Sequence, residues 1–97
     1  MDIPEPLYEQ FTVYSKSGCI NCTRVKQLLQ EKQVKYNIVD CDEYILEDKS
    51  GFLDCIRDLA GQEYKMFPMV FFNKSFIGGF KETQEYFDKL IDFNEDF

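Results

Sequence analysis

The pattern of hydrophobic and polar positions predicts four short β-strands. Phe11–Ser15 is rich in aromatic and β-branched residues, and Val34–Val39 alternates apolar and polar side chains before it ends apolar. Met69–Phe72 is apolar throughout, which is expected of a strand buried on both faces. Asn73-Lys74 then makes a two-residue turn, so we expect Ser75–Ile77 to return as the hairpin partner of this strand.

Hydrophobic residues recur at helical spacing in three other segments. The first helix is expected over about Thr23 to Lys32, and the third over about Thr83 to Asp92. The residues of these two helices predicted to face the core are Val25, Leu28, Leu29, Tyr86, Phe87, Leu90 and Ile91.

The second helix is expected to follow an acidic connection, Asp40–Lys49, which has room for a helical turn at Glu43–Glu47. Ser50 is the predicted N-cap, because a serine hydroxyl can accept a hydrogen bond from the first helical turn. Gly61 is the predicted end, since glycine readily adopts the left-handed conformation of a C-cap. The stripe predicted to face the core is Phe52, Ile56 and Leu59.

The elements follow the order β-α-β-α-β-β-α. The first βαβ unit should pair its strands in parallel through a right-handed crossover, and the hairpin adds an antiparallel pair. We therefore predict an α/β protein with a four-stranded mixed sheet and helices on both faces. Residues 1–10 contain two prolines and little pattern, so we expect a tail or short helical turn there and one domain over residues 11–97.

The composition is that of one small globular domain. The chain has 97 residues, of which 44% are hydrophobic and 16% aromatic, enough to fill one modest core. The net charge of −7 argues against nucleic-acid binding, which needs a basic surface. No apolar run approaches the roughly 20 residues needed to cross a bilayer, and no signal peptide is visible. Four cysteines in such a chain predict a reducing, cytoplasmic location.

Cys19 and Cys22 point to redox chemistry. They lie between a predicted strand and a predicted helix, where a Cys-x-x-Cys motif is typical of a dithiol site and of a thioredoxin-like fold. A helix N-terminus has unpaired N–H groups and a partial positive charge, which favour the nucleophilic thiolate over the thiol. Lys16 would add a full positive charge nearby.

Four segments then occur in the order and spacing of one family. They are Thr12–Cys19, Cys22, Met66–Phe71 and Ile77–Gly79. With these segments the chain resembles the glutaredoxin family, from about Phe11 to Phe93.

The resemblance implies a glutathione-dependent thiol–disulfide oxidoreductase that reduces protein disulfides and glutathione mixed disulfides. Cys19 would be the nucleophile, Cys22 the resolving thiol and Lys16 an activating residue. Glutathione would be the co-substrate, and disulfide-containing or glutathionylated proteins the other partners. We expect a monomer without a metal, a nucleic-acid partner or a membrane partner.

The resemblance also implies a groove for glutathione. In the family the corresponding X–Pro bond is cis and faces the thiols, so Phe67–Pro68 should be cis and the Phe67 backbone should pair with the ligand like an added strand. Gly78-Gly79 would let the backbone approach the ligand, because no Cβ intervenes. The implied glutathione-binding residues are Lys16, Asn21, Met66, Phe67, Pro68, Gly79, Phe80 and Lys81.

The chain departs from the family pattern at three places. Met66-Phe67 is bulkier than the usual Thr-Val, but the backbone contacts survive such a change. Ile20-Asn21 stands between the cysteines where the family commonly has Pro-Tyr, and Phe80–Thr83 replaces a small residue followed by Asp or Ser. Lys81 would attract a carboxylate but repel the ammonium group of a γ-glutamyl end, and Glu82 would supply an acceptor for that group.

Three other functions stay open. The chain could be a dedicated dithiol electron donor, for example to ribonucleotide reductase, recycled by thioredoxin reductase. It could share an iron–sulfur cluster between two subunits, as some glutaredoxins do, or be a non-catalytic domain that kept the fold. One Cys-x-x-Cys pair without histidine does not favour a closed zinc site. Cys41 and Cys55 lie in no motif: we expect a surface or half-buried Cys41 and a small core residue at Cys55, with a regulatory disulfide or glutathionylation site as the alternative.

Overall fold

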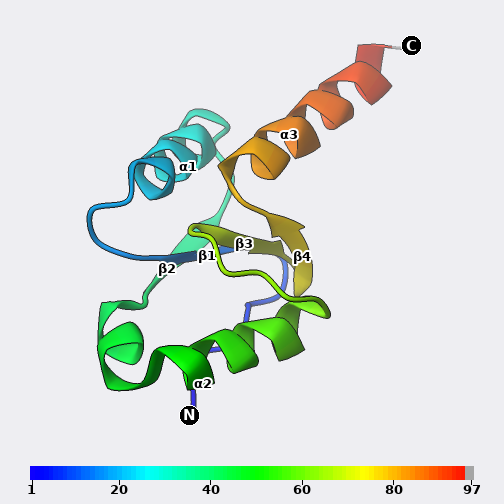
Figure 1. Cartoon of the computed structure of the whole chain (residues 1–97). Coiled ribbons are helices and arrows are strands. Elements are labelled where there is room, and N and C mark those ends of the chain that lie inside the picture. Colours follow the sequence, from blue (N-terminus) through cyan, green and yellow to red (C-terminus); the bar gives the residue numbers. More distant parts are fainter. Residues whose placement is uncertain (96–97) are drawn as a thin grey trace.

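The predicted order of elements is present in the computed structural model, which describes residues 1–95 and the side chains of residues 1–90 (Figure 1). The elements are β1 (Phe11–Ser15), α1 (Ile20–Glu31), β2 (Tyr36–Asp40), α2 (Asp42–Ala60), β3 (Met69–Phe72), β4 (Ser75–Gly78) and α3 (Phe80–Glu95). In the part of the chain that the structure describes, no helix has the length and apolar character needed to cross a membrane.

The four strands form one mixed sheet in the order β2-β1-β3-β4. β1 pairs with β2 in parallel and with β3 in antiparallel orientation, which places Val13 opposite both Ile38 and Val70. Asn73 and Lys74, both with positive φ, make the tight turn between β3 and β4. α1 and α3 cover one face of the sheet and α2 the other (Figure 1). The prediction of a four-stranded mixed sheet with helices on both faces is confirmed.

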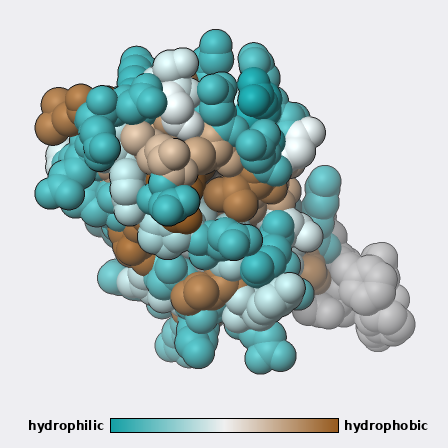
Figure 2. Space-filling view, turned by 90° about the horizontal axis from the view of Figure 1, so that it is seen from below, coloured by the Kyte–Doolittle hydropathy of each residue, from teal (hydrophilic) through white to brown (hydrophobic). Residues whose placement is uncertain are grey.

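Two hydrophobic clusters hold these layers together, one on each face of the sheet. Side chains alternate along β1, so that Phe11 and Val13 join one cluster and Tyr14 the other. The cluster beneath α1 and α3 consists of Phe11, Val13, Val25, Leu29, Val70 and Phe87. The cluster above α2 consists of Tyr14, Val39, Cys41, Phe52, Ile56, Met69 and Phe71. Seen from the α2 side, the surface is mostly hydrophilic, with hydrophobic side chains showing between the polar ones (Figure 2).

Residues 1–10 form no regular helix and lie against the body of the protein. The Tyr14 hydroxyl donates a hydrogen bond to the Pro4 carbonyl, and the Leu7 N–H donates to Thr12 Oγ1 at 3.1 Å. Ile3 packs against the cluster above α2. Burial raises the pKa of Tyr14 well above its ordinary value, so its hydroxyl keeps its proton and acts as a donor.

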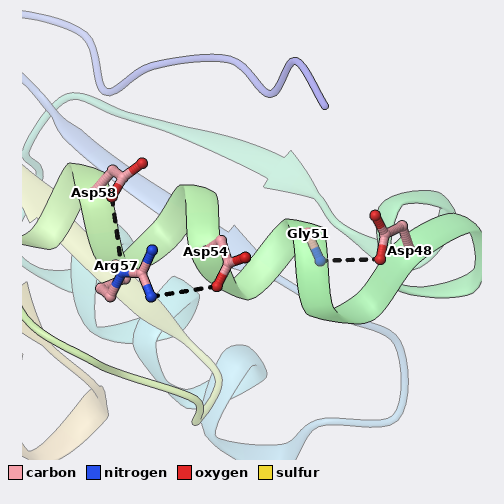
Figure 3. A network of polar contacts seen from close by, with 5 residues as sticks. All are labelled: Asp48, Gly51, Asp54, Arg57 and Asp58. Atoms are coloured by element: carbon pink, nitrogen blue, oxygen red, sulfur yellow. Dashed lines mark hydrogen bonds and ion pairs between the residues drawn. The ribbon is translucent and has the colours of Figure 1, made fainter.

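The acidic connection and the second predicted helix are one kinked helix. α2 begins at Asp42, and Asp48 interrupts it with an extended backbone (φ −161°, ψ 87°). Asp48 Oδ1 accepts a hydrogen bond from the Gly51 N–H at 3.0 Å, so Asp48 caps the second part of α2 (Figure 3). The prediction of Ser50 as the N-cap is therefore wrong by two residues. Gly61 ends the helix in the left-handed conformation, as predicted (φ 75°).

The helices α1 and α3 differ from the prediction in smaller ways. α1 begins at Ile20 rather than Thr23, because Cys19 caps it. In α3 the side chain of Phe87 is 7% exposed, but that of Leu90 is 46% exposed, so the prediction that Leu90 faces the core is wrong. The side chain of Ile91 lies outside the described residues.

We expect Asp48→Ala to lower the free energy of unfolding by about 0.5–2 kcal/mol, since it removes the acceptor that caps the second part of α2. Denaturant unfolding followed by circular dichroism would measure the loss. Ser50→Ala is the matched control and should change stability by less than about 0.5 kcal/mol. A larger loss from the serine change than from the aspartate change would contradict the assignment of the cap.

Candidate active site

Cys19 stands at the start of α1 and Cys22 lies one turn inside the helix. Gly18 has a positive φ of 71°, which turns the chain from β1 into the helix. Cys19 has an extended backbone (φ −104°, ψ 110°), and its Sγ accepts a hydrogen bond from the Cys22 N–H at 3.2 Å. The sulfur thus takes the place that an oxygen has in most N-caps. Cys19 is half-buried, whereas Cys22 is only 1% exposed.

The surroundings of Cys22 keep it protonated. Burial raises the pKa of the Cys22 thiol, and its hydrogen bond with the Cys19 sulfur raises it further. Hydrogen bonds from the Lys16 backbone and the Ser15 hydroxyl act in the opposite direction, because they stabilise the thiolate. The pair therefore consists of an accessible outer sulfur and a protonated inner thiol.

Ser17 ties the loop before Cys19 to the first turn of α2. Its N–H donates to Asp42 Oδ1 at 2.9 Å, and its hydroxyl donates to Asp42 Oδ2. These hydrogen bonds hold the pKa of Asp42 below its ordinary value, so the carboxylate stays charged at neutral pH. Lys16, next to Ser17, extends its ammonium group over the Phe67 ring, 5.3 Å from the ring centre.

A groove of about 530 Å³ lies between the start of α1, the segment before β3 and the start of α3. Six of the residues predicted to bind glutathione line it: Asn21, Met66, Phe67, Gly79, Phe80 and Lys81. Pro68 is buried and its bond to Phe67 is cis, as expected. Lys16 does not line the groove, but its ammonium group lies over the ring of Phe67, which does.

The groove has further lining residues that the prediction of glutathione-binding residues did not include. They are Gln62, Tyr64, Phe76, Ile77, Gly78 and Glu82; of these, Gly78 and Glu82 already had a role at the ligand predicted from the sequence. Glu82 Oε1 accepts the Gly79 N–H at 2.8 Å and lies 3.4 Å from the Tyr64 hydroxyl, which donates to it. A glutamate three residues after a helix N-cap is a known capping signal, which could have identified this role of Glu82 from the sequence. Tyr64 lies on a loop with no periodicity, so nothing in the sequence indicated it.

The Gly78-Gly79 pair leaves room for the side chains of Glu82 and Tyr64. Gly78 has a φ of 133°, and a Cβ there would come within 2.8 Å of the Glu82 side chain. A Cβ on Gly79 would lie 2.7 Å from the Tyr64 hydroxyl oxygen. The two glycines therefore let β4, α3 and the Tyr64 loop meet at one wall of the groove.

The degree of burial of Cys41 and Cys55 is the reverse of what we expected. Cys41 is fully buried in the cluster above α2, and burial raises the pKa of its thiol to about 12. Cys55 is half-buried, and its thiol donates to the Met1 carbonyl at 3.3 Å. Among the side chains that the structure describes, those of residues 1–90, no group of three or more Cys, Asp or Glu could hold a metal ion.

The amino-acid sequence of this chain is similar to those of known glutaredoxins. The protein-family model described as Glutaredoxin matches residues 11–77. Mitochondrial glutaredoxin-2 of Bos taurus is 35% identical over 71 residues, which are 73% of this chain and 43% of that protein. Chloroplastic glutaredoxin-C4 of Oryza sativa is 37% identical over 71 residues and is matched over 50% of its length. This chain thus spans half or less of the length of these relatives.

Solved structures share the whole architecture. Glutaredoxin 1 from Francisella tularensis superposes with a TM-score of 0.72 at 25% identity, over 84% of this chain and 95% of that one. The holo form of glutaredoxin C1 from Populus tremula x tremuloides has a TM-score of 0.68 at 31% identity, over 90% and 84%. A buckwheat glutaredoxin–glutathione complex has a TM-score of 0.64 at 25% identity, over 82% and 69%. The predicted thioredoxin-like fold is confirmed.

We expect iodoacetamide to modify Cys19 first at pH 7–8 in the native protein, since it is the more accessible of the two sulfurs at the helix start. Cys22 and Cys41 should stay unmodified, because they are buried and their raised pKa values keep them protonated. For Cys41 this protection should last as the pH rises past 9, toward its pKa of about 12. Peptide mass spectrometry after short exposures would measure the order of modification.

Addition of denaturant provides the control for this labelling, since all four thiols should then react. Labelling of Cys41 in the native protein at the rate of Cys19 would contradict the buried position.

Proposed function

This chain belongs to the glutaredoxin family, whose members are thiol–disulfide oxidoreductases, and we propose that it reduces protein disulfides and glutathione mixed disulfides with glutathione as co-substrate. One observation carries the proposal. The half-buried Cys19 sulfur caps α1 by accepting the Cys22 N–H, the Cys22 thiol is buried, and Asn21 between the two cysteines lines a groove of about 530 Å³.

Reduction of a glutathione mixed disulfide needs only Cys19. The Cys19 thiolate attacks the glutathione sulfur, the bond between this sulfur and the substrate sulfur breaks, and the substrate leaves as a thiolate that takes up a proton. A second glutathione thiolate then attacks the glutathione sulfur bound to Cys19. This step releases oxidised glutathione and restores the Cys19 thiolate, so that two glutathione-derived sulfurs end in one disulfide.

Reduction of a protein disulfide also uses Cys22. Attack by Cys19 leaves a mixed disulfide between Cys19 and the substrate, and the first substrate thiolate takes up a proton. Cys22 then attacks the Cys19 sulfur and closes a Cys19–Cys22 disulfide, while its proton passes to the second substrate thiolate as that group leaves. The Ser15 hydroxyl and the Lys16 backbone, which hydrogen-bond to the Cys22 sulfur, stabilise the thiolate that this step requires. Two glutathione molecules reduce the new disulfide and leave as oxidised glutathione.

The groove fits the charges of glutathione. Its lining contains Lys81, which can bind a carboxylate, and the Glu82 carboxylate, which can accept from an ammonium group. Lys16, over the Phe67 ring, can bind the second carboxylate of the tripeptide. The Phe67 backbone and the amide of Asn21 add hydrogen-bonding groups. A glutathione complex of the similar buckwheat glutaredoxin supports this assignment.

The cellular setting is part of the same proposal. We propose a reducing compartment, in which a close thiol pair works as a catalyst rather than as a permanent cross-link. The cytoplasmic location expected from the sequence has no support from the relatives, which include proteins named as mitochondrial and chloroplastic. The monomeric state stays a prediction, as do disulfide-containing or glutathionylated proteins as partners.

We expect Cys19→Ser to reduce glutathione-coupled turnover of a small mixed disulfide to the uncatalysed rate, since a serine hydroxyl does not form the attacking thiolate. Cys22→Ser should keep this activity but lose the reduction of protein disulfides, because only the second route uses Cys22. Coupled spectrophotometric assays with the two kinds of substrate would measure both. Full mixed-disulfide turnover by Cys19→Ser would contradict the assignment of the nucleophile.

Cys55→Ser is the matched control, because it removes a half-buried thiol away from the helix start and should leave both activities unchanged. The same assays decide the electron source. Reduction of the Cys19–Cys22 disulfide by thioredoxin reductase and not by glutathione would replace the proposal with that of a dedicated electron donor.

A further inference from the structure

We propose that the ring of Phe67 is a positioning residue that holds the Lys16 ammonium group at the edge of the groove, ready to bind a carboxylate of glutathione. This inference rests on the proposed function. Its first observation is the contact itself: Lys16 Nζ lies over the Phe67 ring at 5.3 Å from its centre, and Phe67 is one of the residues that line the groove. An ammonium group at this distance is attracted to the electron-rich face of an aromatic ring.

The ring is held in place from the core. Phe67 and Phe52 are nearly parallel, with ring centres 5.9 Å apart and planes 8° apart. Phe52 is fully buried and is stacked in turn on Tyr44, at 6.2 Å and 6°. The parallel rings of Tyr44, Phe52 and Phe67 thus connect the cluster above α2 to the groove. This support restricts the long lysine side chain before a ligand arrives. The side chain therefore loses less conformational entropy when it binds the ligand.

The ring positions the lysine without neutralising it. Within the described part of the chain, no carboxylate forms an ion pair with Lys16. The nearby Asp42 receives two hydrogen bonds from Ser17, and the Lys16 charge also lowers its pKa, but the two side chains form no ion pair. A carboxylate partner would have to be displaced by the carboxylate of a ligand, whereas an aromatic ring leaves the N–H donors of the ammonium group free. The arrangement therefore suits a site that receives an anion from outside.

A second contact of the same kind provides a control outside the site. Lys32 Nζ lies over the Phe87 ring at 5.7 Å, at the far end of α1 and away from the groove lining. Removal of this ammonium group tests whether the loss of any lysine–ring contact on the surface changes the KM for glutathione.

The test is a double-mutant cycle on the KM for glutathione in the small mixed-disulfide assay. Phe67→Leu should raise this KM about two- to fivefold, the range of one cation–ring contact, while kcat changes little. Lys16→Met should raise it roughly tenfold, since it removes the charge itself. In the Lys16→Met background, Phe67→Leu should have no further effect. Phe67→Tyr keeps the ring and should keep the KM of the unmodified protein, and Lys32→Met should do the same.

A second readout does not depend on activity. The proton NMR signals of the Lys16 ε-methylene group should be shifted upfield by the ring, keep this shift in Phe67→Tyr and lose it in Phe67→Leu. Because Phe67 also packs on Phe52, the unfolding midpoint of each variant is measured alongside, and Phe67→Tyr with the NMR signal still tests the contact if the leucine variant does not fold.

The outcomes separate this inference from the proposed function. An equal rise in KM from Phe67→Leu with and without Lys16 would overturn the positioning role while the oxidoreductase assignment stands. Absence of glutathione-dependent turnover in the unmodified protein would overturn the proposed function itself, and the NMR shift would then report only on the contact.

Discussion

The hydrogen bond from the Cys22 N–H to the Cys19 sulfur joins the fold and the site in one interaction. The first turn of a helix needs an acceptor for its unpaired N–H groups, and here a sulfur supplies it. The same bond fixes where α1 begins, brings the outer sulfur to the helix start and leaves the inner thiol under the first turn. Gly18, with its left-handed backbone, makes the turn from β1 that this geometry requires.

At the opposite wall of the groove, a side chain likewise caps the N-terminus of a helix, here α3. Glu82 reaches back from the first turn of α3 to the Gly79 N–H and also receives the Tyr64 hydroxyl. Because neither glycine has a Cβ, three chain segments can meet around that carboxylate. The groove is therefore bounded by two helix N-termini, one capped by a sulfur and one by a carboxylate. These ends carry partial positive charge, which makes the space between them suitable for an anionic peptide.

The sequence predicted the parts of this protein that depend on regular spacing. The strands, their order and the Cys-x-x-Cys position follow from side-chain periods and from a motif at a strand–helix junction. Prediction failed where tertiary contacts decide between chemically equal choices. Asp48 and Ser50 are both good N-cap residues, and only the kink in α2 selects the aspartate. Leu90 fits the stripe of α3, but its place on that helix leaves it exposed. The groove contact of Tyr64 depends on how a loop without periodicity packs, which no local pattern records.

The bond from the Tyr14 hydroxyl to the Pro4 carbonyl has a consequence for the limits of the folding unit. A buried hydroxyl that loses its acceptor costs about 1–3 kcal/mol. The residues ahead of β1, which have no helix or strand of their own, thus satisfy the hydroxyl of a core tyrosine. The cooperative unit therefore starts before the first strand, and hydrogen-bond satisfaction rather than secondary structure sets its boundary.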